Sequence, residues 1–433
     1  MSAPELGAAR PRAVGPGPRV RDSGGPGSRW PRPFRGGAPL GLGPALLAVL
    51  GTWLASRVAV LVASLLGARS VQKPSGAVPG PLQLWDRWDV GLFVKVARDG
   101  YLSPRYTDRT EVDLPGMPLA MRLVHPVVGD WVLAGLVVSL LAGLVACAAL
   151  WRLAVDDAER DAAPDAAPDA APDPLPTEPT GERGRRAVLL LVCFPYAVFL
   201  FAGYSEALFL AFASTAWVAA RRRRWALAAL FAAGATGTRI LGIALLAAVA
   251  VQYLVAWQED RRAGRAVPLP RRLGDGAWLA AATTPLLAYL AYFQVRTGHW
   301  DAYTRAMREH WGRGLAAPWE GLATTWRAAT SVDQAAGFRV FWWAEIAAVL
   351  IGVVLTVVLL RRARWGEATY VGACTAIMSC STYWASGVRA VLVWFPLYLL
   401  LARDRRLLGP YLWVCAPAAV VFVVAFTSGA WVD

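Results

Sequence analysis

Long apolar runs separated by arginine clusters dominate the hydrophobic pattern of this chain. A helix needs about 20 apolar residues to cross the hydrocarbon core of a bilayer, and runs near that length predict membrane-crossing helices. The pattern therefore predicts an all-α polytopic membrane protein of about 11 transmembrane helices. The runs fall near residues 40–66, 131–151, 187–202, 204–220, 225–236, 240–257, 277–295, 340–360, 366–380, 390–402 and 410–428.

The arginine clusters predict which ends of these helices face the cytoplasm. Arg and Lys are enriched in cytoplasmic loops, so an even number of crossings must separate successive clusters, and the predicted runs meet this condition. We therefore predict a multi-pass protein of the cell membrane with a cytoplasmic N-terminus. The clusters are Arg29/Arg32/Arg35, Arg183/Arg185/Arg186, Arg221 to Arg224, Arg261/Arg262/Arg265 with Arg271/Arg272, Arg361/Arg362/Arg364 and Arg403/Arg405/Arg406.

The same topology divides the chain into a tail and one transmembrane domain. Residues 1–39, rich in Pro, Gly and Arg, predict a disordered cytoplasmic tail, and 40–428 form the domain. Within it, 156–182 repeats Ala-Ala-Pro-Asp and predicts a low-complexity cytoplasmic linker. Two long segments, 67–130 and 296–339, become the first and second external loops.

Composition narrows the range of partners. The 433 residues are 56% hydrophobic and carry a formal net charge of +14. A basic balance can indicate a nucleic-acid partner, but here the Arg residues lie at the ends of apolar runs, where they meet anionic headgroups. We expect the lipid bilayer as partner and no nucleic acid. The five Cys residues lie inside apolar runs without metal-ligand spacing, so no metal site is expected.

Three apolar stretches, 187–220, 225–257 and 366–402, begin and end beside an arginine cluster, so each must fold as a hairpin whose apex reaches the outer face. An ionisable group at membrane depth costs ~2.5–3.5 kcal/mol and commonly marks function. The apices carry Glu206, Arg239 and Arg389, and we expect Arg57 of the first run at the same outer end. The alternative is that these groups only pair with one another as structural contacts.

The first external loop holds two candidate carboxylates, Asp86 and Asp89. The pattern from residue 90 to residue 97 predicts a short amphipathic helix on the membrane surface, with Gly100 as its C-cap. A carboxylate held by aromatic residues at the lipid–water boundary could act as general base toward a sugar hydroxyl, while Arg residues hold a leaving phosphate. The alternative is that one or both Asp residues are helix N-caps.

Residues 88–101 resemble the WD-x-x-x-[FY]-x-x-IA-x-x-GY signature of the PIG-V-like mannosyltransferases, a family of GT-C membrane glycosyltransferases. Trp88, Asp89, Phe93 and Ala97 occupy the matching positions without a gap. The resemblance runs from about Arg57 to Leu401. Its further pieces, in order, are Leu114–Leu119, Phe194-Pro195, Tyr204–Phe209, Thr238–Gly242, Trp311-Gly312-Arg313 with Pro318-Trp319, and Ser386–Arg389 with Phe395-Pro396. Gly116, Met117 and Ala390 depart from the family pattern.

The resemblance implies an inverting transfer of mannose from a polyprenyl- or dolichyl-phosphate-mannose donor to a glycolipid or glycan acceptor, at an external active site. It implies Asp89 as catalytic base, with Asp86 as the second candidate. No cofactor and no divalent metal are expected. The residues expected to hold the donor phosphate are Arg239, Arg389 and Arg57, and those expected to orient sugar or acceptor are Trp88, Tyr204, Ser205, Glu206 and Trp311.

Three other functions stay open at this point. A GT-C enzyme could use another lipid-linked sugar, and a non-catalytic membrane partner of another glycosyltransferase would share the fold. A lipid-linked sugar transporter would need charges along a path through both leaflets, whereas the polar apices here gather at one face.

Overall fold

The computed structural model describes residues 42–70, 80–105, 110–162 and 180–430. The predicted tail 1–39 and its arginines lie outside these residues. The described chain is helical, and its β pairing is a single isolated bridge between Leu315 and Ser381. The α-helices are α1 Leu42–Ser70, α2 Asp89–Asp99, α3 Gly116–Val128, α4 Trp131–Asp161, α5 Thr180–Val192, α6 Ser205–Arg221, α7 Trp225–Thr238, α8 Gly242–Arg262, α9 Leu269–Ala281, α10 Thr284–Thr297, α11 Ala302–Trp311, α12 Pro318–Thr330, α13 Ala336–Arg361, α14 Trp365–Ser379, α15 Gly387–Leu392, α16 Phe395–Leu401 and α17 Leu408–Ser428. Three short 3₁₀ helices, η1 Thr110–Val112, η2 Ala197–Leu200 and η3 Arg405–Leu407, complete the order.

The predicted fold class, an all-α polytopic membrane protein, is confirmed. Each apolar run lies on one helix or on two consecutive helices. Among the described residues, 5 helices are by themselves long and apolar enough to cross a membrane, and the pair α9 and α10, bent by 42°, would be a sixth. The larger number of about 11 crossings stays a prediction, because the other helices are shorter than the ~20 residues of an upright span.

Tight turns beside arginine clusters join the long helices. Residues 222–224 connect α6 to α7, with Arg223 at φ 56°. Residues 362–364 connect α13 to α14, with Ala363 at φ 52°. A left-handed residue just after a helix lets the chain reverse within a few positions. The two helices of each pair therefore run in opposite directions, and the start of α6 lies at the same end as the end of α7.

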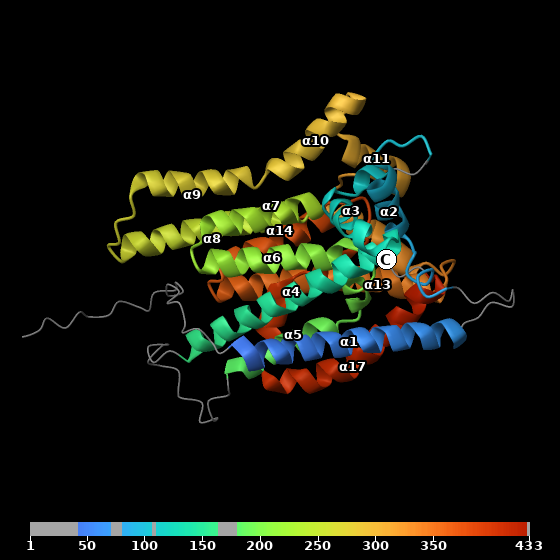
Figure 1. Ribbon diagram of the computed structural model, residues 1–433, viewed down its shortest axis with the longest axis horizontal. Helices are drawn as coiled ribbons and strands as arrows, with labels where there is room; N and C mark the ends of the chain where they lie inside the picture. Colours follow the sequence, from blue (N-terminus) through green and yellow to red (C-terminus); the bar gives the residue numbers. More distant parts are fainter. Residues whose placement is uncertain (1–41, 71–79, 106–109, 163–179, 431–433) are drawn as a thin grey trace, which may run out of the picture. The chain divides into compact units, whose positions relative to one another are not determined.

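Side-by-side packing of α4, α6, α7 and α8 forms the centre of the described fold (Figure 1). Both α6 and α7 bury small residues, among them Ala213 of α6 and Ala228 and Ala232 of α7. Small side chains let apolar helices approach closely, which is how helices associate without a hydrophobic driving force in lipid. Beside this group, α1 packs on α17, and α14 packs on α8 and α13.

The two predicted external loops contain helices of their own. In the first, α2 follows the predicted amphipathic helix and its C-cap is Gly100, as expected. The helix α3 and the 3₁₀ helix η1 in this loop were not predicted. The second loop contains α11 and α12.

The predicted bounds of the linker 156–182 are wrong at both ends. Helix α4 continues to Asp161 and α5 begins at Thr180. The Ala- and Asp-rich composition suggested a linker, but the first of these acidic residues are buried: Asp156 and Asp157 lie inside α4 beside Arg partners. Charge pairing therefore extends the helix beyond its apolar run.

Candidate functional site

A chain of ion pairs joins α2 to the ends of three helices. The Asp89 carboxylate, on the first residue of α2, lies 3.1 Å from Arg389 Nη1 of α15. Arg389 Nε donates to Glu206 Oε1 at 2.7 Å, and Glu206 lies in the first turn of α6. Arg239, which directly follows α7, donates from Nη1 to the same Oε1 at 2.6 Å and to Ser205 Oγ at 2.9 Å. The ion-pair chain therefore joins residues of all three predicted hairpin apices to Asp89.

The four charged groups differ in their access to solvent. Glu206 is fully buried and the Arg389 side chain is 6% exposed, while Asp89 and Arg239 are 27% and 16% exposed. Glu206 therefore acts as the inner counter-charge that holds both guanidinium groups. Asp89 and Arg239 are the two members that a ligand can reach.

Aromatic rings fix the inner part of the site. The Arg389 guanidinium lies 4.9 Å from the ring centre of Phe199 in η2 and 4.8 Å from that of Tyr204. Such contacts stabilise a cation that burial has removed from water. The Tyr204 hydroxyl accepts a hydrogen bond from the Asp89 backbone N–H at 3.3 Å, which ties the start of α2 to the apex before α6.

Close backbone approaches place the apices. A Cβ on Gly203 would lie 3.2 Å from the Gly135 Cα of α4, so the apex before α6 sits directly on that helix. At the third apex, Ser386 has φ 62°, and the Gly387 N–H donates to Glu345 Oε2 of α13 at 2.6 Å. These contacts aim Glu206 and Arg389 toward each other.

Trp88, directly before Asp89, has φ 51° and ψ −123°, a backbone conformation that is strained for a residue with a side chain. It is the N-cap of α2 and makes no side-chain capping hydrogen bond. Neither Asp86 nor Asp89 is therefore the N-cap, and that alternative is wrong for both. Backbone strain of this kind gathers at functional sites, where it aims the neighbouring residue.

Two predicted site residues lie apart from the ion pairs. Asp86 is exposed, and its carboxylate is near Gly91 on the first turn of α2. Trp311 ends α11, where its ring packs on His310 and its carbonyl accepts a hydrogen bond from Tyr383. In the described residues, neither contacts Asp89, Arg239 or Arg389.

Arg57 lies near the middle of α1 and not at its outer end, so its predicted position is wrong. Its side chain is buried, with the guanidinium 4.0 Å from the ring centre of Trp53 and 5.8 Å from that of Phe201. Its two Nη atoms have no hydrogen-bond partner among the described residues. The structure therefore does not join Arg57 to the ion pairs of Asp89, although stacking on Trp53 offsets part of its desolvation.

One buried carboxyl of the site was missed by the sequence analysis. Asp113 follows η1, is 7% exposed, and its Oδ2 has no hydrogen-bond partner in the described structure. Burial raises the pKa of the Asp113 carboxyl well above its usual range, the charge of Asp89 raises it further, and Arg389 and Arg239 oppose both effects. Asp113 is therefore close enough to these three groups to sense their charges.

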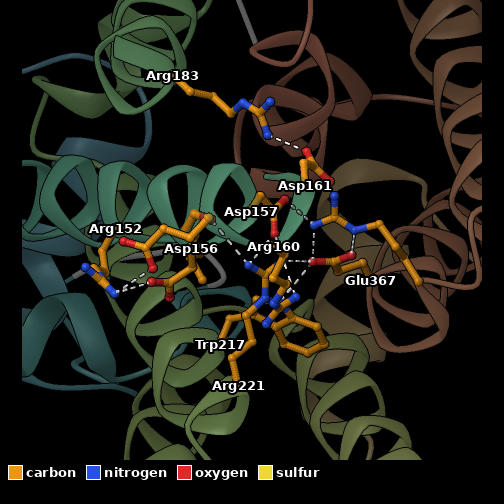
Figure 2. Close-up of polar contacts among 12 residues, drawn as sticks. Arg152, Asp156, Asp157, Arg160, Asp161, Arg183, Trp217, Arg221 and Glu367 are labelled. Carbon is orange, nitrogen blue, oxygen red and sulfur yellow. Dashed lines mark hydrogen bonds and ion pairs between the residues drawn. The ribbon is translucent and has the colours of Figure 1, made fainter. Parts of the chain in front are cut away.

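A second charged network lies at the other end of α6. Figure 2 shows Asp157 and Arg160 of α4 beside Arg221 and Glu367. Asp157 lies 2.8 Å from Arg221, and Arg221 lies 2.6 Å from Glu367 of α14. Because a helix rises about 1.5 Å per residue, Glu206 and Arg221 are about 22 Å apart along α6. The two networks therefore mark opposite ends of the helical group, and the second one lies among the arginine clusters.

Fold and site together define a polytopic all-α membrane protein with a charge-balanced ion-pair site at one end of its helices. No family model matches the chain, and no curated protein matches it. Among solved structures, it is similar to ArnT from Cupriavidus metallidurans, whose crystal structure was determined bound to undecaprenyl phosphate. The identity is 16% and the TM-score 0.46, and the alignment covers 83% of this chain and 61% of ArnT. The chain thus spans about three fifths of the length of that relative.

Proposed function

We propose that this protein is a GT-C membrane glycosyltransferase that uses a lipid-phosphate-linked sugar as donor. The observation that carries the proposal is the ion-pair chain from Asp89 through Arg389 and Glu206 to Arg239. It puts a partly exposed carboxylate and a partly exposed guanidinium in one site, which are the two groups that this transfer needs.

The proposed chemistry is a single displacement at the anomeric carbon. Asp89 takes the proton of the acceptor hydroxyl, whose oxygen forms a bond to the anomeric carbon from the face opposite the phosphate. The bond from that carbon to the phosphate oxygen breaks, and its electron pair leaves with the polyprenyl phosphate. Arg239 binds the phosphate, because its planar guanidinium can donate two parallel hydrogen bonds to two of the phosphate oxygen atoms. The proton ends on Asp89.

Glu206 and Arg389 have supporting roles in this scheme. Arg389 donates to Glu206 from two nitrogen atoms, so its position beside Asp89 is fixed before a ligand arrives. A preorganised cation stabilises developing charge without the cost of reorienting during the reaction. Tyr204 and Ser205 hold Asp89 and Arg239 through one hydrogen bond each.

Mannose is the proposed sugar, and a glycolipid or glycan on the external face is the proposed acceptor. Both rest on the WD-type signature at residues 88–101 and on the arginine pattern, which predicts that Asp89 and Arg239 face away from the cytoplasm. Polyprenyl- or dolichyl-phosphate-mannose is the corresponding donor, and the scheme needs no cofactor or metal.

The test is the Asp89→Asn variant, assayed for transfer from polyprenyl-phosphate-mannose in membranes containing the full chain. Loss of the base should lower the rate by about 10²–10⁴-fold, because general-base catalysis contributes that much. Asp99→Asn is the matched control, since Asp99 lies on the same loop and its carboxylate pairs with Arg98 and Arg105. A wild-type transfer rate in a normally inserted Asp89→Asn protein would show that Asp89 is not the catalytic base.

A further inference from the structure

Asp113 is the buried carboxyl beside this site that the proposed reaction leaves without a role. Its backbone is held on two sides: the carbonyl accepts a hydrogen bond from the Tyr101 hydroxyl, and the N–H donates to the Thr110 carbonyl at 3.1 Å. Its side chain, by contrast, has no ion pair or hydrogen bond in the described residues. A buried polar atom without a partner costs about 1–3 kcal/mol, so its presence calls for a ligand or a function.

The contact between α3 and α7 places Asp113 next to Arg239. A Cβ on Gly116, at the start of α3, would lie 2.5 Å from Thr238 Oγ1 and 2.9 Å from the Gly237 carbonyl oxygen. The backbone of α3 therefore lies directly against the last turn of α7, and Arg239 is the next residue. Asp113 precedes Gly116 by only a proline-containing dipeptide, and its carboxyl lies within electrostatic reach of Arg239.

Burial favours the neutral form of Asp113, and the charge of Asp89 adds to this effect against Arg389 and Arg239. Asp89 and Glu206 balance Arg239 and Arg389, so an ionised Asp113 would leave the site with excess negative charge. A donor phosphate on Arg239 would add to that excess. The tyrosines Tyr101, Tyr289 and Tyr303 also lie within electrostatic reach of Asp113, and their neutral hydroxyls bring no charge.

We propose that Asp113 binds a hydroxyl group of the sugar on the lipid-linked donor and is a sugar-specificity residue of this site. The inference rests on the proposed function and deepens it. A neutral carboxyl donates one hydrogen bond and accepts another, which suits a sugar hydroxyl, whereas Arg239 serves the phosphate. Different residues therefore bind the two parts of the donor: Arg239 binds the phosphate and Asp113 binds the sugar.

Binding of two lipids to the purified full chain separates these roles. The probes are polyprenyl phosphate and polyprenyl-phosphate-mannose, and intrinsic tryptophan fluorescence gives each Kd. The wild-type protein should bind the sugar-bearing lipid more tightly. Asp113→Ala should reduce that preference by about 2–10-fold, the range that one hydrogen bond supplies, and leave the Kd of polyprenyl phosphate within about twofold.

Asp113→Asn supplies the discriminating variant, because an amide keeps one donor and one acceptor in nearly the same shape. It should retain most of the preference for the sugar-bearing lipid. Asp113→Leu, branched at the same γ position but without hydrogen-bonding atoms, replaces Asp113→Ala if the alanine variant does not fold. Asp99→Asn, on the same loop, should behave as the wild type.

The outcomes distinguish this inference from the function on which it rests. A wild-type preference that persists in Asp113→Ala or Asp113→Leu would overturn the sugar contact and leave the glycosyltransferase proposal standing. Loss of the preference in Asp113→Asn as large as in Asp113→Leu would overturn the neutral hydrogen-bonding role. A wild-type chain that binds neither lipid would overturn the proposed function and this inference together.

Discussion

The carboxylate of Asp89 lies 3.1 Å from Nη1 of Arg389, a residue 300 positions later in the sequence. The contact links a loop helix to a short helix that follows α14, and Glu206 of α6 holds Arg389 from the other side. A partly exposed carboxylate and a buried guanidinium so arranged form a site whose inner half is rigid and whose outer half is open to a ligand.

Arg389→Lys should therefore weaken transfer without removing the positive charge. A lysine ammonium is a point charge and cannot keep the two-nitrogen contact with Glu206 while also reaching Asp89. We expect the rate to fall about 10–100-fold, the loss typical of a misplaced catalytic group. In the Asp89→Asn background the same change should have a much smaller effect, because the two residues act together. An equal loss of rate in both backgrounds would show that Arg389 acts independently of Asp89.

Glu206→Gln should lower the free energy of unfolding, because Glu206 is a shared counter-charge for two arginines. Glu206 is fully buried and pairs with Arg239 and Arg389, so its neutral analogue leaves Arg239 without its counter-charge and Arg389, among the described residues, with Asp89 alone. Breaking a buried ion pair by changing one partner costs about 3–5 kcal/mol. Thermal unfolding in detergent measures the loss, and Glu309→Gln, an exposed site on α11, should change the stability by less than about 0.5 kcal/mol. Equal stability of the two variants would contradict the bridging role.

Asp157→Asn tests whether the network at the far end of α6 is structural only. Asp157 pairs with Arg221 and Arg364 and is buried. The substitution should lower the free energy of unfolding by about 3 kcal/mol or more. Polyprenyl phosphate binding by the protein that remains folded should be unchanged, because about 22 Å of helix separates the two networks. A weaker Kd for that lipid would show that the two ends are coupled.

The hairpin apices were predictable because a membrane constrains them strongly. Runs of apolar residues bounded by arginine clusters can only reverse at their polar midpoints, so Glu206, Arg239 and Arg389 had to gather at one end. The sequence also allowed the alternative that these three groups pair with one another. Asp89, their partner on α2, was predicted from the WD-type motif and not from the hydrophobic pattern.

Asp113 and Arg57 could not be assigned correctly from the pattern. Asp113 lies between η1 and α3, outside any helix, and only the contact of Gly116 with Thr238, which is tertiary, brings it to the site. Arg57 lies within a uniformly apolar run, where the sequence does not tell the depth of a residue along the helix. At the other end, Asp157 looked like linker composition, because burial by ion pairing leaves no apolar signal.

Gly116→Ala tests the contact that places Asp113. The added Cβ would meet Thr238 Oγ1 and the Gly237 carbonyl oxygen, and the carbonyl cannot move without shifting α7. Overpacking of this kind costs about 1–3 kcal/mol. The variant should also bind polyprenyl-phosphate-mannose more weakly, because α3 and Arg239 move apart. Gly276→Ala is the matched control, since a Cβ there meets nothing within 4 Å in α9, and alanine should stabilise the helix slightly. Equal behaviour of the two variants would contradict the close contact.

The raised pKa of Asp113 predicts that its contribution to stability falls as the pH rises. An ion-paired aspartate has the opposite effect. Burial, and then the charge of Asp89, raise the pKa of Asp113 in the folded protein, while in the unfolded chain it is about 3.9. The folded state therefore binds a proton that the unfolded state has released. Stability from this group is complete below about pH 3.9 and is lost as the pH rises toward the folded pKa, by at most about 1.4 kcal/mol per pH unit.

Asp113→Asn does not titrate and should lack this loss. The free energy of unfolding of the wild type, minus that of the variant, should therefore fall as the pH rises from about 4 toward neutral. Unfolding of both proteins in the same detergent at each pH gives this difference and cancels the titration of all other groups. Because Arg239 and Arg389 oppose the raised pKa, Arg239→Gln should move the fall to higher pH. A difference that stays constant or grows with pH would show that Asp113 is ionised in the folded protein, and the neutral hydrogen-bonding role proposed for it would be overturned.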